Sequence, residues 1–193
     1  FVEPDTITYN SAISACDKGA QWQRALLLFT TMDSTSVEPD VISYNSAISS
    51  CEKGNTWQVA LTLLSDMDRV SIEPDVVTYS TSIVACNRGS DWQYALLLFD
   101  SLCESHSHVN RVSYNSVLQD IHCHPTGKHL FAQGLAKGLY DCIYTSSNGL
   151  LDLHNCSPGA AWLALERHAH QVTSRRHPRV QLITGWGKHR KAW

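Results

Sequence analysis

The first 110 residues are poor in basic side chains: five lysines and arginines stand against 14 aspartates and glutamates, which gives a formal charge of −9. Residues 111–193 instead carry ten basic and four acidic side chains, a charge of +6. Two segments of opposite charge indicate two functional parts. Because phosphate groups are bound by basic surfaces, the second segment is the better candidate for contact with phosphates.

Other absences exclude whole classes of protein. No uninterrupted apolar run approaches the ~20 residues that cross a bilayer, so we expect no membrane partner. Although His122, Cys123, His124 and His129 lie close in sequence, no second ligand pair has metal spacing, so we expect no metal site. The chain also lacks an initiator methionine, and we expect it to be a fragment whose targeting segment is missing.

The number of cysteines is odd: there are seven in 193 residues. A disulfide framework is typical of short secreted domains with paired cysteines. Cys16, Cys51 and Cys86 lie 35 residues apart, which indicates one small buried residue used three times. We therefore expect free thiols and a reducing compartment.

One segment occurs three times at a spacing of 35 residues. It is EPDTITYNSAI at 3–13, EPDVISYNSAI at 38–48 and EPDVVTYSTSI at 73–83. Three other residue types recur at the same spacing, namely Gly19, Gly54 and Gly89, Trp22, Trp57 and Trp92, and Ala25, Ala60 and Ala95. A fixed period of this length predicts a stacked array whose neighbouring units bury one another's apolar faces.

Each unit has the pattern of two helices. In the first unit, apolar residues at helical spacing predict a helix over about 7–18, which we expect Gly19 to end. A second apolar stripe predicts a helix over about 21–33. The Glu-Pro-Asp turn then separates the units, because proline cannot continue a helix. The recurrent tryptophans lie on the second stripe, so we expect them in the core rather than as stacking platforms for bases.

A fourth unit, 106–140, is degenerate. Tyr114 keeps its place, but His124-Pro125 replaces the glycine and no tryptophan follows. We expect a closing helix pair at 112–122 and 128–137, since the terminal unit of a stack is atypical.

The pattern changes after Tyr140. Residues 141–149 have the composition of a polar linker. A short strand at 149–154, a helix at 160–172 and a second strand at 180–184 then predict a βαβ unit. The predicted domains are therefore 1–140 and 150–193, joined by that linker.

The period of 35, the VxTYN-like opening of the first helices (TITYN, VISYN and VVTYS) and the EPD turn resemble pentatricopeptide repeats. The resemblance covers 1–140, with repeats starting near 6, 41 and 76 and a degenerate one at 111. The related tetratricopeptide repeat has a period of 34 and lacks this turn. The resemblance implies a mostly α fold, an α-solenoid of helix-turn-helix repeats followed by a small partial α/β module. It also implies binding of single-stranded RNA, one base per repeat, and a location in the plastid or mitochondrion.

In that family the fifth residue of a repeat and the last residue before the next repeat select the base. The base-selecting residues that the resemblance assigns are Asn10, Asp40, Asn45, Asp75, Ser80, Asn110 and Asn115. The second residues would wedge between bases, and these are Ile7, Ile42, Val77 and Val112. Asn with Asp favours uracil and Ser with Asn favours adenine, so the implied partner is U-U-A from 5′ to 3′. Asn115 has no last residue to pair with.

Two motifs in the second segment, LDLH at 151–154 and TGWGKH at 184–189, resemble the Smr (small MutS-related) domain, some members of which are endonucleases. The resemblance implies catalytic roles for Asp152 and His154. It implies phosphate binding by Thr184, Gly185, Gly187, Lys188 and His189. No cofactor is implied except a divalent metal if the module is an active nuclease. Asn155 stands where the family usually has glycine and the chain ends early, so RNA binding without catalysis is favoured over an endoribonuclease.

A protein-interaction scaffold in the manner of tetratricopeptide repeats is the alternative from another class. The charge of −9 on the repeats favours it, because acidic surfaces repel phosphates. Acidic side chains on the outer helix faces would leave the inner face neutral, so the charge alone does not decide between RNA and a protein partner.

Overall fold

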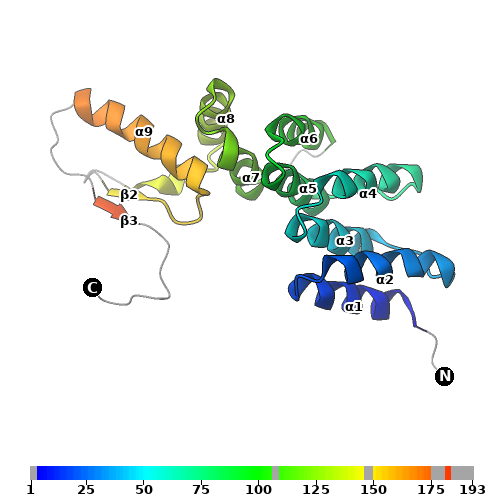
Figure 1. Ribbon diagram of the computed structural model, residues 1–193. Coiled ribbons are helices and arrows are strands. Elements are labelled where there is room, and N and C mark those ends of the chain that lie inside the picture. The colour runs from blue at the N-terminus through cyan, green and yellow to red at the C-terminus, as the bar shows by residue number, and fades with distance from the viewer. Residues whose placement is uncertain (1–3, 106–108, 146–149, 175–180, 184–193) are drawn as a thin grey trace, which may run out of the picture. The chain divides into compact units, whose positions relative to one another are not determined.

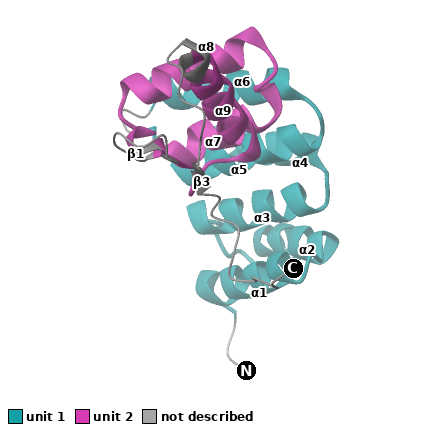
Figure 2. Cartoon of the chain, turned by 90° about the vertical axis from the view of Figure 1, so that its left-hand side faces the viewer, with its two compact units in different colours: residues 1–109 teal, residues 110–193 magenta. Residues whose placement is uncertain are grey.

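The computed structural model describes residues 4–105, 109–145, 150–174 and 181–183 (Figure 1). The chain divides into two compact units, residues 1–109 and 110–193, coloured teal and magenta in Figure 2. No helix among the described residues is both long and apolar enough to span a membrane.

The first unit consists of three helix pairs, one pair for each full repeat. The helices are α1 Thr6–Lys18, α2 Trp22–Ser34, α3 Val41–Lys53, α4 Trp57–Arg69, α5 Val76–Arg88 and α6 Trp92–Ser105. Within the unit, α3 packs against both α1 and α5, while α2 contacts α1 and α3, and α4 contacts α3 and α5 (Figure 1). The predicted helical repeats are confirmed, and the first helices form a continuous series along the unit.

Apolar side chains at the repeated positions fill the space between these helices. Ile13, Ile48 and Ile83, one from each first helix, are completely buried. Cys51 and Cys86 are buried as predicted, whereas Cys16 is half-buried, and none of the six described cysteines forms a disulfide. Burial is the main cause that raises the pKa of the Cys86 thiol to about 11. These thiols therefore act as small core residues.

An aspartate begins each first helix. The Asp5, Asp40 and Asp75 side chains accept the backbone N–H of Thr8, Ser43 and Thr78 at 2.8, 2.9 and 2.8 Å. In the second and third repeats the N3 hydroxyl also accepts the N–H of the aspartate, which completes a capping box. A cap of this kind stabilises a helix by about 1 kcal/mol. The Glu-Pro-Asp turn therefore ends one repeat and starts the helix of the next.

The recurrent glycines end the first helices where predicted, but backbone freedom is not the reason. The φ angle is −81° at Gly19, −79° at Gly54 and −76° at Gly89, values open to any residue. The left-handed conformation falls on the following residue, with φ of 54° at Asn55 and 61° at Ser90. The backbone conformation of the turn therefore does not explain why glycine occupies these sites.

Tryptophan from the preceding repeat occupies the place of a side chain at two of these glycines. A Cβ added to Gly54 would lie 2.5 Å from Cγ of Trp22, and one added to Gly89 would lie 2.1 Å from Cδ1 of Trp57. The nearest atom to a Cβ on Gly19 is 3.4 Å away, an ordinary contact. Trp57 also packs against the core cluster. The tryptophan and glycine periods are thus one feature, a contact between consecutive repeats.

The second unit combines a helix pair with a small sheet. Its elements are α7 Arg111–Ile121, α8 Pro125–Ala136, the 3-10 helix η1 Asp141–Ile143, β1 Tyr144–Thr145, β2 Leu150–Asp152, α9 Pro158–Ser174 and β3 Gln181–Ile183. The strand order is β1-β2-β3. Strand β1 pairs antiparallel with β2, with Tyr144 opposite Leu151, and β2 pairs parallel with β3, with Leu151 opposite Leu182.

Two expectations about this unit need correction. Residues 141–145, expected within a polar linker, form η1 and β1, and β1 supplies an edge strand to the sheet. Helix α8 begins at Pro125 instead of about residue 128, because proline is favoured in the first turn and the His124 side chain accepts the backbone N–H of Thr126. The domain limits drawn from the sequence stay a prediction.

Helix α9 packs closely on α7. A Cβ added to Gly159 would lie 1.9 Å from the backbone oxygen of Leu118, so only glycine allows this approach. Further along α9, the side chains of Ala160, Leu163 and Ala164 are buried. The start of α9 and the turn before it are thereby held against α7.

Candidate functional site

The first predicted base-selecting pair is joined by hydrogen bonds. Asn10 lies in α1, and its Nδ2 donates to Oδ1 of Asp40, the cap of α3, at 3.0 Å. The Ser43 hydroxyl donates to Oδ1 of the same asparagine at 2.5 Å. The same hydroxyl oxygen also lies 3.0 Å from Oδ1 of Asp40. Three side chains from two consecutive repeats thus form one closed network.

The same network occurs 35 residues later. Asn45 Nδ2 donates to Oδ1 of Asp75 at 3.3 Å, and the Thr78 hydroxyl donates to Asn45 Oδ1 at 2.6 Å. The structure therefore brings together two of the pairs that the sequence assigns. It adds the N3 hydroxyls of Ser43 and Thr78, which were not predicted as part of the site. The sequence contained a signal for them, because serine or threonine occupies this position in every repeat.

The charge of the aspartates fixes the orientation of the asparagine amides. Partial burial acts to raise the pKa of Asp40 and Asp75, but the hydrogen bonds from the N3 backbone and hydroxyl and from the asparagine outweigh it, so both pKa values are lowered. An ionised carboxylate only accepts hydrogen bonds, so each asparagine must turn Nδ2 toward it. One N–H and one lone pair of each amide then remain for a ligand, at fixed places.

The third predicted pair falls in different compact units, with Ser80 in the first and Asn110 in the second. Ser80 is buried, with 9% of its surface exposed. The Asn110 side chain caps α7 by accepting the backbone N–H of Val112 at 2.9 Å and of Ser113 at 3.1 Å. Adenine selection by this pair stays a prediction.

The four predicted wedge residues are aliphatic side chains left in solvent. Each is the second residue of a first helix, and their exposed fractions are 74% for Ile7, 61% for Ile42, 57% for Val77 and 63% for Val112. Large aliphatic side chains are usually buried, and here the exposure recurs in register with the period. Their insertion between bases stays a prediction.

Asn115, the fifth residue of the degenerate repeat, also has partners. Its Nδ2 donates to the backbone oxygen of Asn155 at 2.7 Å, and its Oδ1 accepts from the Tyr140 hydroxyl at 2.9 Å. Both partners belong to the second unit, at separations of 25 and 40 residues that do not match the 35-residue period.

Part of the acidic charge of the repeats is paired along the first helices. Lys53 Nζ lies 2.7 Å from Oδ2 of Asp17, and Arg88 lies 2.9 Å from Oε1 of Glu52. Each pair joins the ends of consecutive first helices with the same 36-residue offset. These pairs neutralise Asp17 and Glu52 locally, but the formal charge of −9 already counts Lys53 and Arg88, so residues 1–110 stay net acidic.

The predicted catalytic pair lies at the end of β2. The His154 backbone N–H donates to Asp152 Oδ1 at 2.9 Å, and the ring Nδ1 is 3.7 Å from the same oxygen. The predicted phosphate loop, residues 184–189, lies outside the described residues. Among the side chains that the structure describes, no group of three or more His, Cys, Asp or Glu residues could hold a metal ion.

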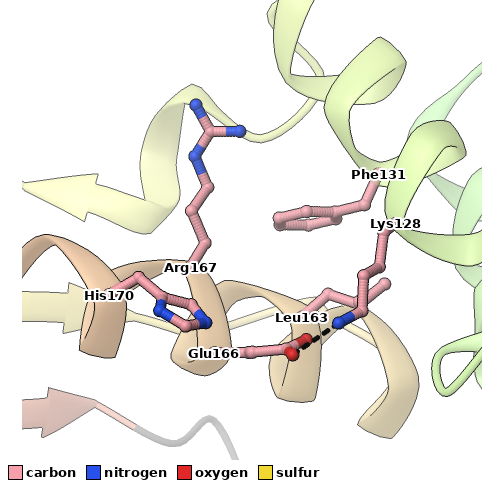
Figure 3. Close-up of a pocket in the computed structure, with 6 residues that line it drawn as sticks. All are labelled: Lys128, Phe131, Leu163, Glu166, Arg167 and His170. Atoms are coloured by element: carbon pink, nitrogen blue, oxygen red, sulfur yellow. Dashed lines mark hydrogen bonds and ion pairs between the residues drawn. The ribbon is translucent and has the colours of Figure 1, made fainter. Parts of the chain in front are cut away.

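A pocket of about 260 Å³ lies between α8 and α9 in the second unit (Figure 3). Lys128 and Phe131 from α8 face Leu163, Glu166, Arg167 and His170 from α9 (Figure 3). Lys128 Nζ is held by Glu166 Oε1 at 2.6 Å, which neutralises the lysine and weakens the pocket as an anion site. The sequence did not predict this pocket.

Solved structures provide the comparison for this fold. PPR10 in complex with an 18-nt psaJ RNA element matches 92% of this chain and 24% of its own, with 22% identity and a TM-score of 0.68. PPR10 from maize matches 90% of this chain and 24% of its own, with 19% identity and a TM-score of 0.65. The PPR domain of Arabidopsis thaliana protein-only RNase P 1, in complex with tRNA, matches 88% of this chain and 82% of its own, with 14% identity and a TM-score of 0.65.

These likenesses show the fold, and this chain spans about a quarter of the length of PPR10. No curated protein matches the sequence. The model of the PPR repeat family matches residues 4–53 and 39–88, which hold α1 to α5 and both asparagine–aspartate networks. Residues 4–88 of this chain are therefore pentatricopeptide repeats.

Proposed function

We propose that the repeats bind single-stranded RNA and that each asparagine–aspartate network contacts one base. The observation that carries the proposal is the recurrence of one network, Asn10 with Asp40 and Asn45 with Asp75, beside exposed aliphatic side chains in the same register. The solved relatives are PPR proteins, some in complex with RNA, which supports the proposal. One base per repeat is how such arrays bind RNA.

The chemistry of the amide suits a pyrimidine edge. Uracil presents an N3–H donor beside carbonyl acceptors, and the asparagine offers one lone pair and one N–H. Because the aspartate fixes which side of the amide donates, only one order of donor and acceptor on the base fits. Exposed side chains such as Ile42 and Val77 would pack against the base faces. By the family code this gives uracil at the first two positions and adenine at the third.

The test is an electrophoretic shift of the full chain with U-rich and A-rich single-stranded RNA. We expect the U-rich RNA to bind about tenfold or more tightly, because a good bidentate contact discriminates by about 1–3 kcal/mol. A matched variant with Asn10→Ala and Asn45→Ala should lose this preference while keeping its helical circular dichroism. Measurements at about 50 and 200 mM salt separate base contacts from phosphate contacts.

A protein-interaction scaffold is the rival function, favoured by the acidic repeats. It predicts no shift of either RNA at any protein concentration tested, or equal shifts that vanish together at the higher salt. Location in a plastid or mitochondrion remains part of the proposal and is supported by the resemblance alone.

For residues 150–193 we propose an Smr-like module that contacts the same RNA, with catalysis the less favoured alternative. The observation in its support is that Asp152 and His154 lie together at the end of β2. In a nuclease, such a pair would move a proton during phosphodiester cleavage. RNA cleavage that survives the Asp152→Ala and His154→Ala double substitution would remove the catalytic assignment.

A further inference from the structure

Asn115 makes the same kinds of hydrogen bond as Asn10 and Asn45, with different partners. In all three, Nδ2 donates to an oxygen that only accepts: a carboxylate for Asn10 and Asn45, and the backbone oxygen of Asn155 for Asn115. In all three, Oδ1 accepts from a hydroxyl, which for Asn115 belongs to Tyr140. The amide of Asn115 is therefore oriented like the other two and leaves the same two groups for a ligand.

Tyr140 is held firmly enough to orient the amide. Its side chain is completely buried, and its ring centroid lies 5.0 Å from that of Phe131. A Cβ added to Gly134 would lie 2.7 Å from Cε2 of the ring, so α8 closes over it. Burial is the main cause that raises the pKa of Tyr140, so the phenol stays protonated and can donate to Asn115.

The Asn155 carbonyl is fixed by the turn between β2 and α9. The residue has a φ of 62°, a left-handed conformation that asparagine and glycine tolerate best. Its neighbour Cys156 donates its backbone N–H to the Leu153 oxygen at 3.2 Å, which closes the turn. Only the main chain of Asn155 takes part in the contact with Asn115.

The aliphatic side chain that accompanies each asparagine is also present. Val112 is 63% exposed and lies three residues before Asn115 on α7, the same spacing as Ile7 and Asn10 on α1. The degenerate repeat therefore keeps both an oriented amide and an exposed aliphatic side chain, although it lacks a following aspartate.

We propose that Tyr140 and the Asn155 carbonyl are positioning groups that take the place of the missing aspartate and hold the Asn115 amide to contact a fourth base, uracil. The second unit thus supplies to Asn115 what the next repeat supplies to Asn10 and Asn45. The inference rests on the proposed function. It adds that Tyr140 and the turn after β2 complete a base site that contains no carboxylate.

The test measures the affinity of the full chain for RNAs of sequence U-U-A-N in which the fourth base is varied. We expect the fourth-base uracil to be preferred over adenine by about fivefold or more, in line with one good base contact. Tyr140→Phe removes the hydroxyl and keeps the ring, so it should abolish the fourth-base preference and leave the second-base preference unchanged. Asn155→Gly keeps both the carbonyl and the left-handed turn, so it should retain both preferences.

The outcomes separate this inference from the proposed function. A second-base preference without any fourth-base preference overturns the inference and leaves RNA binding by the repeats intact. A fourth-base preference that survives Tyr140→Phe, or that Asn155→Gly abolishes, also overturns it. If Tyr140→Phe does not fold, Asn115→Ala gives the same comparison between the fourth and second bases. If the unchanged chain shows no base preference at any position, the proposed function itself is overturned.

Discussion

Replacing Asp75 with alanine should abolish base discrimination at the second position and lower the free energy of unfolding by about 1–2 kcal/mol. The carboxylate has two roles, since it caps α5 through the Thr78 backbone N–H at 2.8 Å and accepts the Asn45 amide at 3.3 Å. Without it, the helix loses its cap and the Asn45 amide can rotate. Urea unfolding measures the first effect, and binding of RNAs that differ in the second base measures the second.

Two further variants separate these roles. Asp75→Asn should keep the cap, as Asn110 does for α7, and should change the free energy of unfolding by less than about 0.5 kcal/mol. An amide can both donate and accept, so it no longer fixes the orientation of Asn45, and we expect discrimination between uracil and cytosine to fall. Asp5→Ala removes a cap without touching either asparagine network, so it should leave every base preference unchanged. Equal base discrimination in Asp75→Ala and the unchanged chain would contradict the assignment.

The pH dependence follows from the lowered pKa of Asp75. A carboxylate whose pKa lies below its ordinary value of 3.8 in the folded state stabilises the fold above that value. This contribution is lost only as the pH falls through the lowered pKa. Base discrimination at the second position should therefore stay constant from about pH 8 to about pH 5.

Gly89→Ala should destabilise the first unit by about 1–3 kcal/mol, and Gly54→Ala somewhat less, through overpacking against tryptophan. The added Cβ would lie 2.1 Å from Trp57 at Gly89 and 2.5 Å from Trp22 at Gly54. The atoms met belong to the five-membered part of each indole ring, near its attachment to the chain, so relief requires the whole ring to move. Thermal or urea unfolding of the three single glycine variants measures the effect.

Gly19→Ala is the matched control, because its backbone conformation is the same and its nearest new contact is 3.4 Å. We expect it to be neutral or slightly stabilising, since alanine restricts the unfolded chain more than glycine does. In a Trp57→Ala background, Gly89→Ala should lose most of its effect, which a double-mutant cycle would show. Equal destabilisation by all three glycine substitutions would contradict the contact and indicate a backbone requirement.

The period carried most of what could be predicted about the first unit. The two helices of each repeat follow from residues that recur every 35 positions, whereas the pairing of Asn45 with Asp75 was implied by the resemblance to pentatricopeptide repeats. The role of Gly54 could not be predicted in the same way, because a glycine after a helix usually signals a left-handed turn. Here glycine is required because a tryptophan from the preceding repeat packs against it. A local sequence pattern does not reveal such packing between repeats.

The second unit was harder to predict because nothing in it repeats. Strand β1 has two residues, Tyr144 and Thr145, too few to show alternation. The partners of Asn115 are 25 and 40 residues away in sequence, and one of them is a backbone oxygen, which no side-chain pattern reveals. These contacts depend on how α9 packs on α7, which only the folded chain determines.

The central claim is that an asparagine of one repeat and the aspartate that starts the next together select one base. The most direct test compares the unchanged chain with Asn45→Thr on RNAs that differ only in the second base. The account predicts that the unchanged chain prefers uracil there, and that the variant shifts its preference toward guanine while its first-base preference stays the same. An unaltered order of base preference in the variant would contradict the account.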